Sequence, residues 1–250
     1  MRYITLLEHG HKNIVNMKIP RIIHQIWSGI EDPLPEQFRV LGETWKEHHP
    51  NWKYELWNHE KMNSFILEFY PQYWNTYRNF KYNIQRWDAI RYLILDKIGG
   101  IYTDFDTECV KPINDFLENK ECCFSIEPQE HANILGLPML INNAIMMSIP
   151  GHDFMKRVII EVFERTSNTP YSHRNLEILD TTGPLMLTRT YEQYDKKNDV
   201  FLMPAENMSP FTQQDTINYL NNRNIDLLES KLEEAYAIHY FLNTWSLKND

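Results

Sequence analysis

The alternation of apolar and polar residues is clearest across residues 83–113. Between residues 84 and 98, apolar side chains recur every three or four positions, which predicts a helix with a broad buried face. Gly99 and Gly100 end this helix, because glycine adopts the left-handed conformation of a C-cap without strain. The residues that follow predict a strand over 101–106. We expect the rest of the chain to be arranged around this helix, glycine corner and strand.

Similar patterns predict elements on both sides of this stretch. Apolar runs predict strands over 19–27, 52–57, 121–126 and 140–147, and helical patterns are found over 36–47, 152–165 and 185–194. Two early strands joined through a helix indicate a parallel βαβ unit. We therefore expect an α/β fold with a mostly parallel central sheet flanked by helices. At 250 residues the chain is long enough for one sizeable core, so we expect a single domain over 19–250 after an extension over 1–18.

Two acidic residues end the predicted central strand. Alternate side chains of an extended chain point the same way, so Asp104 and Asp106 project together while Phe105 points away. Such a pair suits Mg²⁺ or Mn²⁺, which prefer oxygen ligands and also bind diphosphate oxygens. A cation held there would neutralise charge on a departing nucleoside diphosphate. Most Asp-x-Asp pairs are solvated carboxylates, but this pair ends a buried strand, where open α/β sheets bind ligands.

The segments 84–92, IQRWDAIRY, and 99–106, GGIYTDFD, resemble one family of glycosyltransferases. Its members include the fungal inositolphosphorylceramide and outer-chain mannosyltransferases. Bacterial capsular-sugar transferases are similar, and the glucosylating domain of large clostridial toxins is more distantly similar. The resemblance extends over about residues 19–245 and implies a GT-A fold. Trp87, Thr103 and Phe105 depart from the usual residues of the family.

The resemblance implies roles for the residues of these two segments. Asp106 is expected to bind the metal, and Asp104 to contact sugar or ribose hydroxyls and assist at the metal. Asp88 is expected to bind ribose or sugar, and Arg91 is expected to bind sugar or phosphate. The alternative for Asp88 and Arg91 is a simple helical ion pair, because they are three residues apart. A C-terminal histidine completes the metal shell in several GT-A enzymes, which makes His239 a third candidate ligand; its alternative is a packed histidine.

Other donor-binding candidates match family positions outside the central carboxylates. Trp27 is expected to stack on the base, Tyr102 to touch the diphosphate, and Asn142 or Asn143 to lie near the sugar or acceptor. Gly183 of the Thr-Gly-Pro turn and Trp245 complete the set, which thus consists of Trp27, Asp88, Arg91, Tyr102, Asp104, Asn142, Asn143, Gly183 and Trp245. The structural alternatives are a core tryptophan and ordinary turn residues.

Composition limits the partners and the cellular compartment expected for the protein. With 25 basic and 34 acidic residues the net charge is −9, which argues against nucleic acid as a partner. Three cysteines provide no disulfide framework, so we expect reduced thiols and a cytoplasmic protein. The first 18 residues lack the apolar core of a signal peptide, and no segment reaches transmembrane length. The many rings over 65–80 keep peripheral membrane contact open, although no basic cluster accompanies them.

These observations lead to one main functional hypothesis. We expect a metal-dependent retaining glycosyltransferase, as in polysaccharide biosynthesis, that moves a hexose from GDP-mannose or a UDP-hexose to a saccharide or lipid-linked acceptor. The alternatives are a protein-glucosylating effector of the toxin type, a haloacid-dehalogenase-like phosphatase and an inactive sugar-binding module. Glu108 occupies a position where such phosphatases carry Thr or Val, which disfavours that reading. A binding module would not need Asp88, Arg91, Asp104 and Asp106 together.

Overall fold

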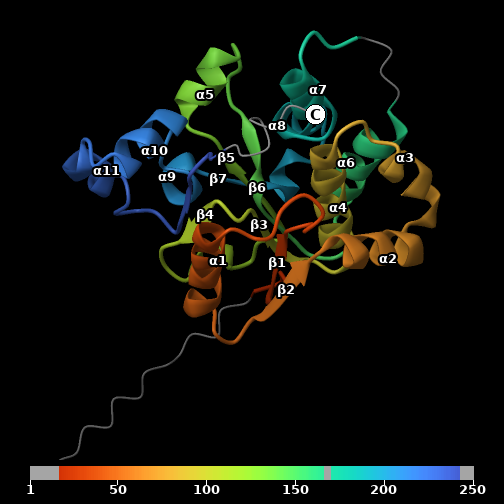
Figure 1. Cartoon of the computed structure of the whole chain (residues 1–250), viewed down its shortest axis with the longest axis horizontal. Coiled ribbons are helices and arrows are strands. Elements are labelled where there is room, and N and C mark those ends of the chain that lie inside the picture. The colour runs from red at the N-terminus through yellow and green to blue at the C-terminus, as the bar shows by residue number, and fades with distance from the viewer. Residues whose placement is uncertain (1–16, 166–169, 243–250) are drawn as a thin grey trace, which may run out of the picture.

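The computed structural model describes residues 17–165 and 170–242, and Figure 1 shows their arrangement. Within these ranges a six-stranded sheet has the order β2-β1-β3-β6-β5-β7. Its strands are β1 Ile22–Ile26, β2 Lys53–Trp57, β3 Gly100–Thr103, β5 Cys122–Ile126, β6 Ile141–Ser148 and β7 Phe201–Met203. A second, two-stranded sheet pairs β4, Thr107–Cys109, with β8, Ala237–His239.

The strand directions confirm a mostly parallel central sheet. β1 is parallel to β2 and β3, and β5 is parallel to β7. β6 is antiparallel to both of its neighbours, β3 and β5, so β3 and β5 run in the same direction. The carboxyl ends of β1, β3 and β5 therefore lie at one edge of the sheet, together with the start of β6. In open α/β sheets this is the edge where ligands bind.

Helices lie on both faces of the central sheet (Figure 1). The helices of the described residues are α1 Glu36–His48, α2 His59–Phe69, α3 Trp74–Arg78, α4 Asn83–Lys97, α5 Gln129–Ile134, α6 Asp153–Glu164, α7 Arg174–Thr181, α8 Pro184–Glu192, α9 Ala205–Met208, α10 Gln213–Leu220 and α11 Ile225–Ser230. Successive strand residues alternate between two cores. Tyr102 and Phe124 pack in one core with α2, α4, α6 and α8. Ile101 and Cys123 pack in the other with α1 and α9.

The predicted helix and glycine corner are confirmed. α4 is buried around most of its circumference, including its polar residues Asp88 and Arg91. Gly99 and Gly100 have φ angles of +71° and +104°. A Cβ atom at Gly99 would lie 2.8 Å from the Ser148 carbonyl oxygen, and one at Gly100 would lie 2.6 Å from a backbone oxygen of β1. Both positions therefore require glycine, for the backbone conformation and for the close approach of neighbouring strands.

Many rings between α2 and α4 belong to the core. Tyr73 stacks on Phe163 of α6 with ring centroids 4.5 Å apart, and Tyr77 is buried. The three cysteines are free and buried, as their number predicted. In the described part of the chain, no helix combines the length and apolar character needed to cross a bilayer.

Candidate active site

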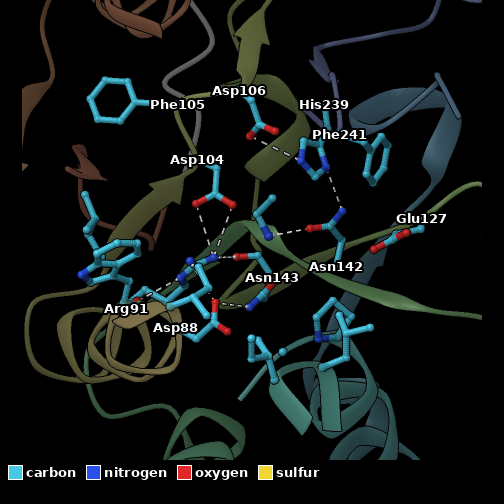
Figure 2. A pocket seen from close by; sticks show the side chains of 18 of the residues that line it. Asp88, Arg91, Asp104, Phe105, Asp106, Glu127, Asn142, Asn143, His239 and Phe241 are labelled. Carbon is cyan, nitrogen blue, oxygen red and sulfur yellow. Dashed lines mark hydrogen bonds and ion pairs between the residues drawn. The ribbon is translucent and has the colours of Figure 1, made fainter. Parts of the chain in front are cut away.

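A cavity of about 570 Å³ opens at the edge of the sheet where β1, β3 and β5 end (Figure 2). Its lining comes from α4, the turn after β3, the start of β6, the turn between α7 and α8, and β8. Nearly all the residues that the sequence nominated line this cavity: Trp27, Asp88, Arg91, Tyr102, Asp104, Asp106, Asn142, Asn143, Gly183 and His239. Trp245 lies outside the described residues.

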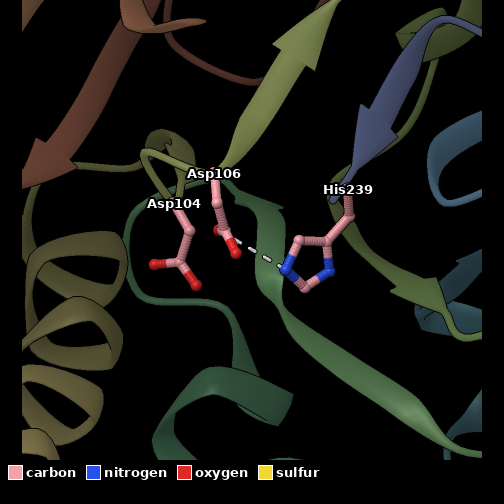
Figure 3. A group of neighbouring side chains, drawn as sticks. All are labelled: Asp104, Asp106 and His239. Atoms are coloured by element: carbon pink, nitrogen blue, oxygen red, sulfur yellow. Dashed lines mark ion pairs between the residues drawn. The ribbon is translucent and has the colours of Figure 1, made fainter. Parts of the chain in front are cut away.

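The two carboxylates of the Asp-x-Asp motif lie in a turn after β3. The prediction that the strand continues to residue 106 is wrong, because β3 ends at Thr103. The Thr107 amide and hydroxyl both donate to the Asp104 carbonyl oxygen, at 3.3 and 2.6 Å, which closes the turn and starts β4. Phe105 points away and packs edge-on against Trp27, with centroids 6.1 Å apart. Asp104 and Asp106 nevertheless lie side by side (Figure 3).

His239 joins this carboxylate pair. β4 pairs with β8 so that Thr107 lies opposite His239, which brings the imidazole beside the turn. Ligand atoms of Asp104, Asp106 and His239 all lie within 4.8 Å of one another (Figure 3). The Leu242 amide donates to Asp106 Oδ2 at 3.0 Å, so the C-terminal segment also holds this carboxylate. Two carboxylates and an imidazole form a donor set that suits Mn²⁺ or Mg²⁺.

Asn142 determines which nitrogen of His239 carries the proton. The Ala144 amide donates to Asn142 Oδ1, which turns Asn142 Nδ2 toward His239 Nδ1, 3.0 Å away. An amide nitrogen only donates, so Nδ1 accepts and a neutral His239 carries its proton on Nε2. Nε2 lies 3.5 Å from Asp106 Oδ1. In this arrangement His239 faces Asp106 as a donor, and ligation through Nε2 requires loss of that proton.

The two carboxylates of the turn have opposite pKa shifts. Burial raises the pKa of Asp104, and the negative charge of Asp106 adds to the increase, whereas Arg91 opposes it. Burial also acts to raise the pKa of Asp106, but the charge and hydrogen bond of His239 and the Leu242 amide lower it overall. Two carboxylates this close to each other resist ionising at the same time, so their pKa values move apart. A divalent cation would relieve this repulsion.

Asp88 and Arg91 form the helical ion pair that their spacing allows, and this pair is part of a larger buried network. Arg91 Nη2 lies 3.0 Å from Asp88 Oδ1, and the two side chains are only 5% and 7% exposed. Arg91 Nη1 donates to the Asn143 carbonyl oxygen at 2.9 Å and lies 3.4 Å from Asp104. The Arg91 guanidinium also lies over the Tyr102 ring, 4.5 Å from its centroid, and the Tyr102 hydroxyl donates to Asp104. One buried cation thus connects two carboxylates and an aromatic ring.

Residues from β6 and the turn before α8 complete the environment of Asp88. Asn143 Nδ2 donates to Asp88 Oδ1 at 3.0 Å, and Thr182 Oγ1 donates to Asp88 Oδ2 at 2.9 Å. Burial raises the pKa of Asp88 to about 6, although Arg91 and these donors lower it. Asn142 and Asn143 lie in strand β6, so the turn interpretation of this pair is wrong. Thr182 is not among the site residues expected from the sequence, because nothing in the sequence reports its contact with Asp88 of α4.

Trp27 and Gly183 both line the cavity. Trp27 is half-buried, packs edge-on against Phe38 and Phe105, and donates through its indole N–H to the Asp32 carbonyl oxygen at 2.8 Å. Gly183 is the N-cap of α8, and a Cβ atom there would lie 3.0 Å from the Leu179 Cα atom of α7. Glycine therefore allows α7 and α8 to pack closely at this position. The absence of a side chain at Gly183 also leaves room in the cavity.

Glu127 and His131 line the cavity as well, and sequence reasoning missed both. Glu127 follows β5, and His131 is on α5. The order of strands in the sheet places them near the central carboxylates. No motif in the sequence reports this, since the pairing of β5 with β6 depends on tertiary structure.

Comparison with known proteins agrees with this geometry. Residues 35–123 match the glycosyltransferase sugar-binding region containing the DXD motif. The chain is 33% identical over 180 residues to the mannosyl phosphorylinositol ceramide synthase SUR1 of Saccharomyces cerevisiae, which covers 71% of this chain but only 43% of that enzyme. It is 25% identical over 232 residues to an uncharacterized glycosyltransferase of Acanthamoeba polyphaga mimivirus, covering 91% of this chain and 84% of the viral protein.

A solved structure confirms the fold. The PaToxG glycosyltransferase superposes with a TM-score of 0.50 at 16% sequence identity, over 85% of this chain and 76% of the other. The sheet order, with a single antiparallel strand between parallel ones, is that of the GT-A fold expected from the sequence. Residues 35–123 thus carry the sugar-binding region of the glycosyltransferases that contain the DXD motif, and the chain is similar to members of that family.

Proposed function

We propose that this chain is a metal-dependent, retaining glycosyltransferase that moves a hexose from a nucleotide sugar to a hydroxyl group of an acceptor. The observation that carries the proposal is the convergence of Asp104, Asp106 and His239 in one cavity beside the Asp88–Arg91 network. The chain matches 43% of its fungal relative, so the transferase activity is a proposal for this chain. GDP-mannose and UDP-hexoses are the donors to test, and the acceptor is a saccharide or a lipid-linked molecule.

Asp106, Asp104 and His239 are the residues that would hold Mn²⁺ or Mg²⁺. Their oxygen and imidazole donors fit either ion, and their mutual distances fit one shared cation. When bound, the ion neutralises negative charge on the diphosphate. Asn142 holds His239 in place, and the Leu242 amide holds Asp106. These contacts orient the carboxylate and the imidazole before any donor arrives.

The other residues of the cavity position the sugar. Asp88 and Arg91 hold ribose, sugar or phosphate, Asp104 contacts hydroxyl groups, and Tyr102 lies next to the diphosphate. In front-face transfer the bond between the anomeric carbon and phosphate breaks while the bond to the acceptor oxygen forms. The acceptor proton passes to the departing phosphate oxygen. The Asp88 and Asp104 carboxylates would stabilise the positive charge that develops on the sugar ring.

A screen of donor hydrolysis tests this function without knowledge of the acceptor. Purified protein is incubated with GDP-mannose and several UDP-hexoses, with Mn²⁺ or with a chelator. We expect release of nucleoside diphosphate from one class of donor, in the presence of metal only. Absence of cleavage for every donor, or equal cleavage in chelator, would contradict the proposal.

Trp27 is predicted to bind the base of the donor. Trp27→Ala should weaken binding of the nucleoside diphosphate by about 1–3 kcal/mol, the range for a base stacked on an aromatic side chain. Titration calorimetry with GDP and UDP in the presence of Mn²⁺ measures the change. Trp52→Ala is the control, because Trp52 is a half-buried tryptophan that does not line this cavity. Equal affinity in Trp27→Ala and the wild type would exclude stacking.

A further inference from the structure

The cavity has a second polar group, opposite the Asp88–Arg91 network, that the proposed donor site does not use. Glu127 follows β5 and His131 lies on α5, and both line the cavity. Figure 2 shows the Glu127 side chain extending toward Asn142 and the centre of the cavity. Its side chain is only 10% exposed. A carboxylate so nearly buried needs hydrogen-bond donors, because burial removes most of its water.

His131 fixes the orientation of this carboxylate. The Gln213 amide donates to His131 Nε2 at 3.2 Å, so a neutral His131 carries its proton on Nδ1. Nδ1 then donates to Glu127 Oε2 at 2.7 Å. No residue in the ranges 17–165 and 170–242 donates a hydrogen bond to the other oxygen, Oε1. Glu127 thus presents one oriented acceptor atom to the cavity.

Phe241 connects this group to the carboxylate pair. Its ring contacts His239 at a centroid distance of 3.9 Å and lies edge-on to His131 at 4.7 Å. Phe241 has a φ angle of +49°, a strained conformation for an aromatic residue. Asp106 fixes the backbone on both sides of Phe241. The Asp106 carbonyl oxygen accepts a hydrogen bond from the Tyr240 amide, and the Asp106 side chain accepts one from the Leu242 amide. Phe241 thus contacts both His131 and His239, next to the turn that carries Asp106.

We propose that Glu127 is an acceptor-binding residue, which accepts a hydrogen bond through Oε1 from a hydroxyl of a cyclic polyol, a pyranose or a cyclitol. Ile134 and Leu135, which are 81% and 42% exposed, also line the cavity and give it apolar surface that a ligand can cover. Apolar surface with one oriented polar group is the usual composition of a small-molecule subsite. The carboxylate selects donors such as hydroxyls, and the apolar surface suits the C–H face of a ring. This assignment rests on the proposed transferase function.

Ligand-observed NMR tests the subsite without requiring turnover. Wild-type protein with Mg²⁺ and GDP or UDP is mixed with methyl α-D-mannopyranoside or myo-inositol, and saturation transfer to each probe is measured. We expect transfer to at least one probe on the wild type. In Glu127→Ala we expect roughly 10-fold weaker binding or more, because hydrogen bonds to charged groups are among the stronger ones. Glu127→Gln, which keeps the shape of the side chain, should fall between the two.

The controls separate the subsite from folding and from the donor site. Glu130→Gln removes a charge from an exposed position of α5, three residues from Glu127, and should bind the probe as the wild type does. All variants should keep the affinity of the wild type for nucleoside diphosphate, which shows that they are folded. Unchanged probe binding in both Glu127 variants would overturn the assignment, and so would absence of saturation of both probes on the wild type. Failure of the transferase proposal would instead appear as absence of donor cleavage by the wild type.

Discussion

Asp106→Asn is expected to abolish metal-dependent binding of nucleoside diphosphate and to reduce turnover by roughly 10²–10⁴-fold. The estimate corresponds to a loss of about 3–5 kcal/mol of charge stabilisation by a bound cation. The thermal midpoint should change little, because Asn keeps the shape of the side chain and still accepts from the Leu242 amide. Calorimetry with Mn²⁺ and GDP or UDP, together with thermal denaturation, measures both quantities.

Two further variants show whether the effect of Asp106→Asn arises from loss of a metal ligand. Glu108→Gln removes a carboxylate two residues away that accepts from the Tyr240 hydroxyl and does not line the cavity, so it should bind metal and nucleotide as the wild type does. His239→Ala should weaken Mn²⁺ binding if the imidazole is a ligand. If His239 only packs and donates to Asp106, that variant should lose thermal stability and keep its Mn²⁺ affinity. Undiminished Mn²⁺-dependent binding by Asp106→Asn would refute the metal assignment.

Arg91→Met is expected to destabilise the fold by about 3–5 kcal/mol at neutral pH, the usual cost of leaving buried charges without their partner. Arg91 lies between Asp88 and Asp104, and its side chain is 5% exposed. Met fills a similar volume, so the loss reflects charge more than packing. Lys97→Met is the matched control, because it removes an exposed cation from the same helix and should change stability by no more than about 0.5 kcal/mol.

The pH dependence of this loss identifies its cause. The pKa of Asp88 is raised to about 6 in the folded wild type, from an ordinary value of 3.8. Protonation of Asp88 therefore favours folding, and this stabilisation is complete below 3.8 and is lost as the pH rises through about 6. Without Arg91 the pKa of Asp88 should rise further. The deficit of Arg91→Met should thus be largest at pH 8 and smaller at pH 5, whereas an equal deficit at both values would indicate a packing defect.

The sequence predicted the elements whose structure depends on local pattern and agrees with the tertiary packing. The helix over 84–98 and its glycine corner were predictable, because apolar periodicity and the need for a positive φ angle are local properties. The end of β3 was not, because the alternation of residues 101–106 suits a longer strand. Hydrogen bonds from Thr107 decide the turn, and no local pattern encodes them.

The residues of the candidate site also differ in whether a local pattern or only the tertiary structure identifies them. Asp104 and Asp106 could be found from their spacing, and His239 only from its position relative to a family pattern. Its contact with Asp106 depends on the pairing of β4 with β8, far apart in the sequence. Glu127 belongs to no motif, and its place in the cavity follows from the order of β3, β6 and β5 in the sheet.

A time course by proton NMR of donor cleavage with Mg²⁺ tests the central claim most directly. The nucleotide sugar is the one with an α-linked hexose that the donor screen selects, and the anomeric signals of the first product are recorded before mutarotation. A retaining, metal-dependent transferase predicts an α-configured product first, and none in chelator. A β-configured first product would contradict front-face transfer and indicate an inverting base, and a donor consumed equally without metal would contradict the role of Asp104 and Asp106.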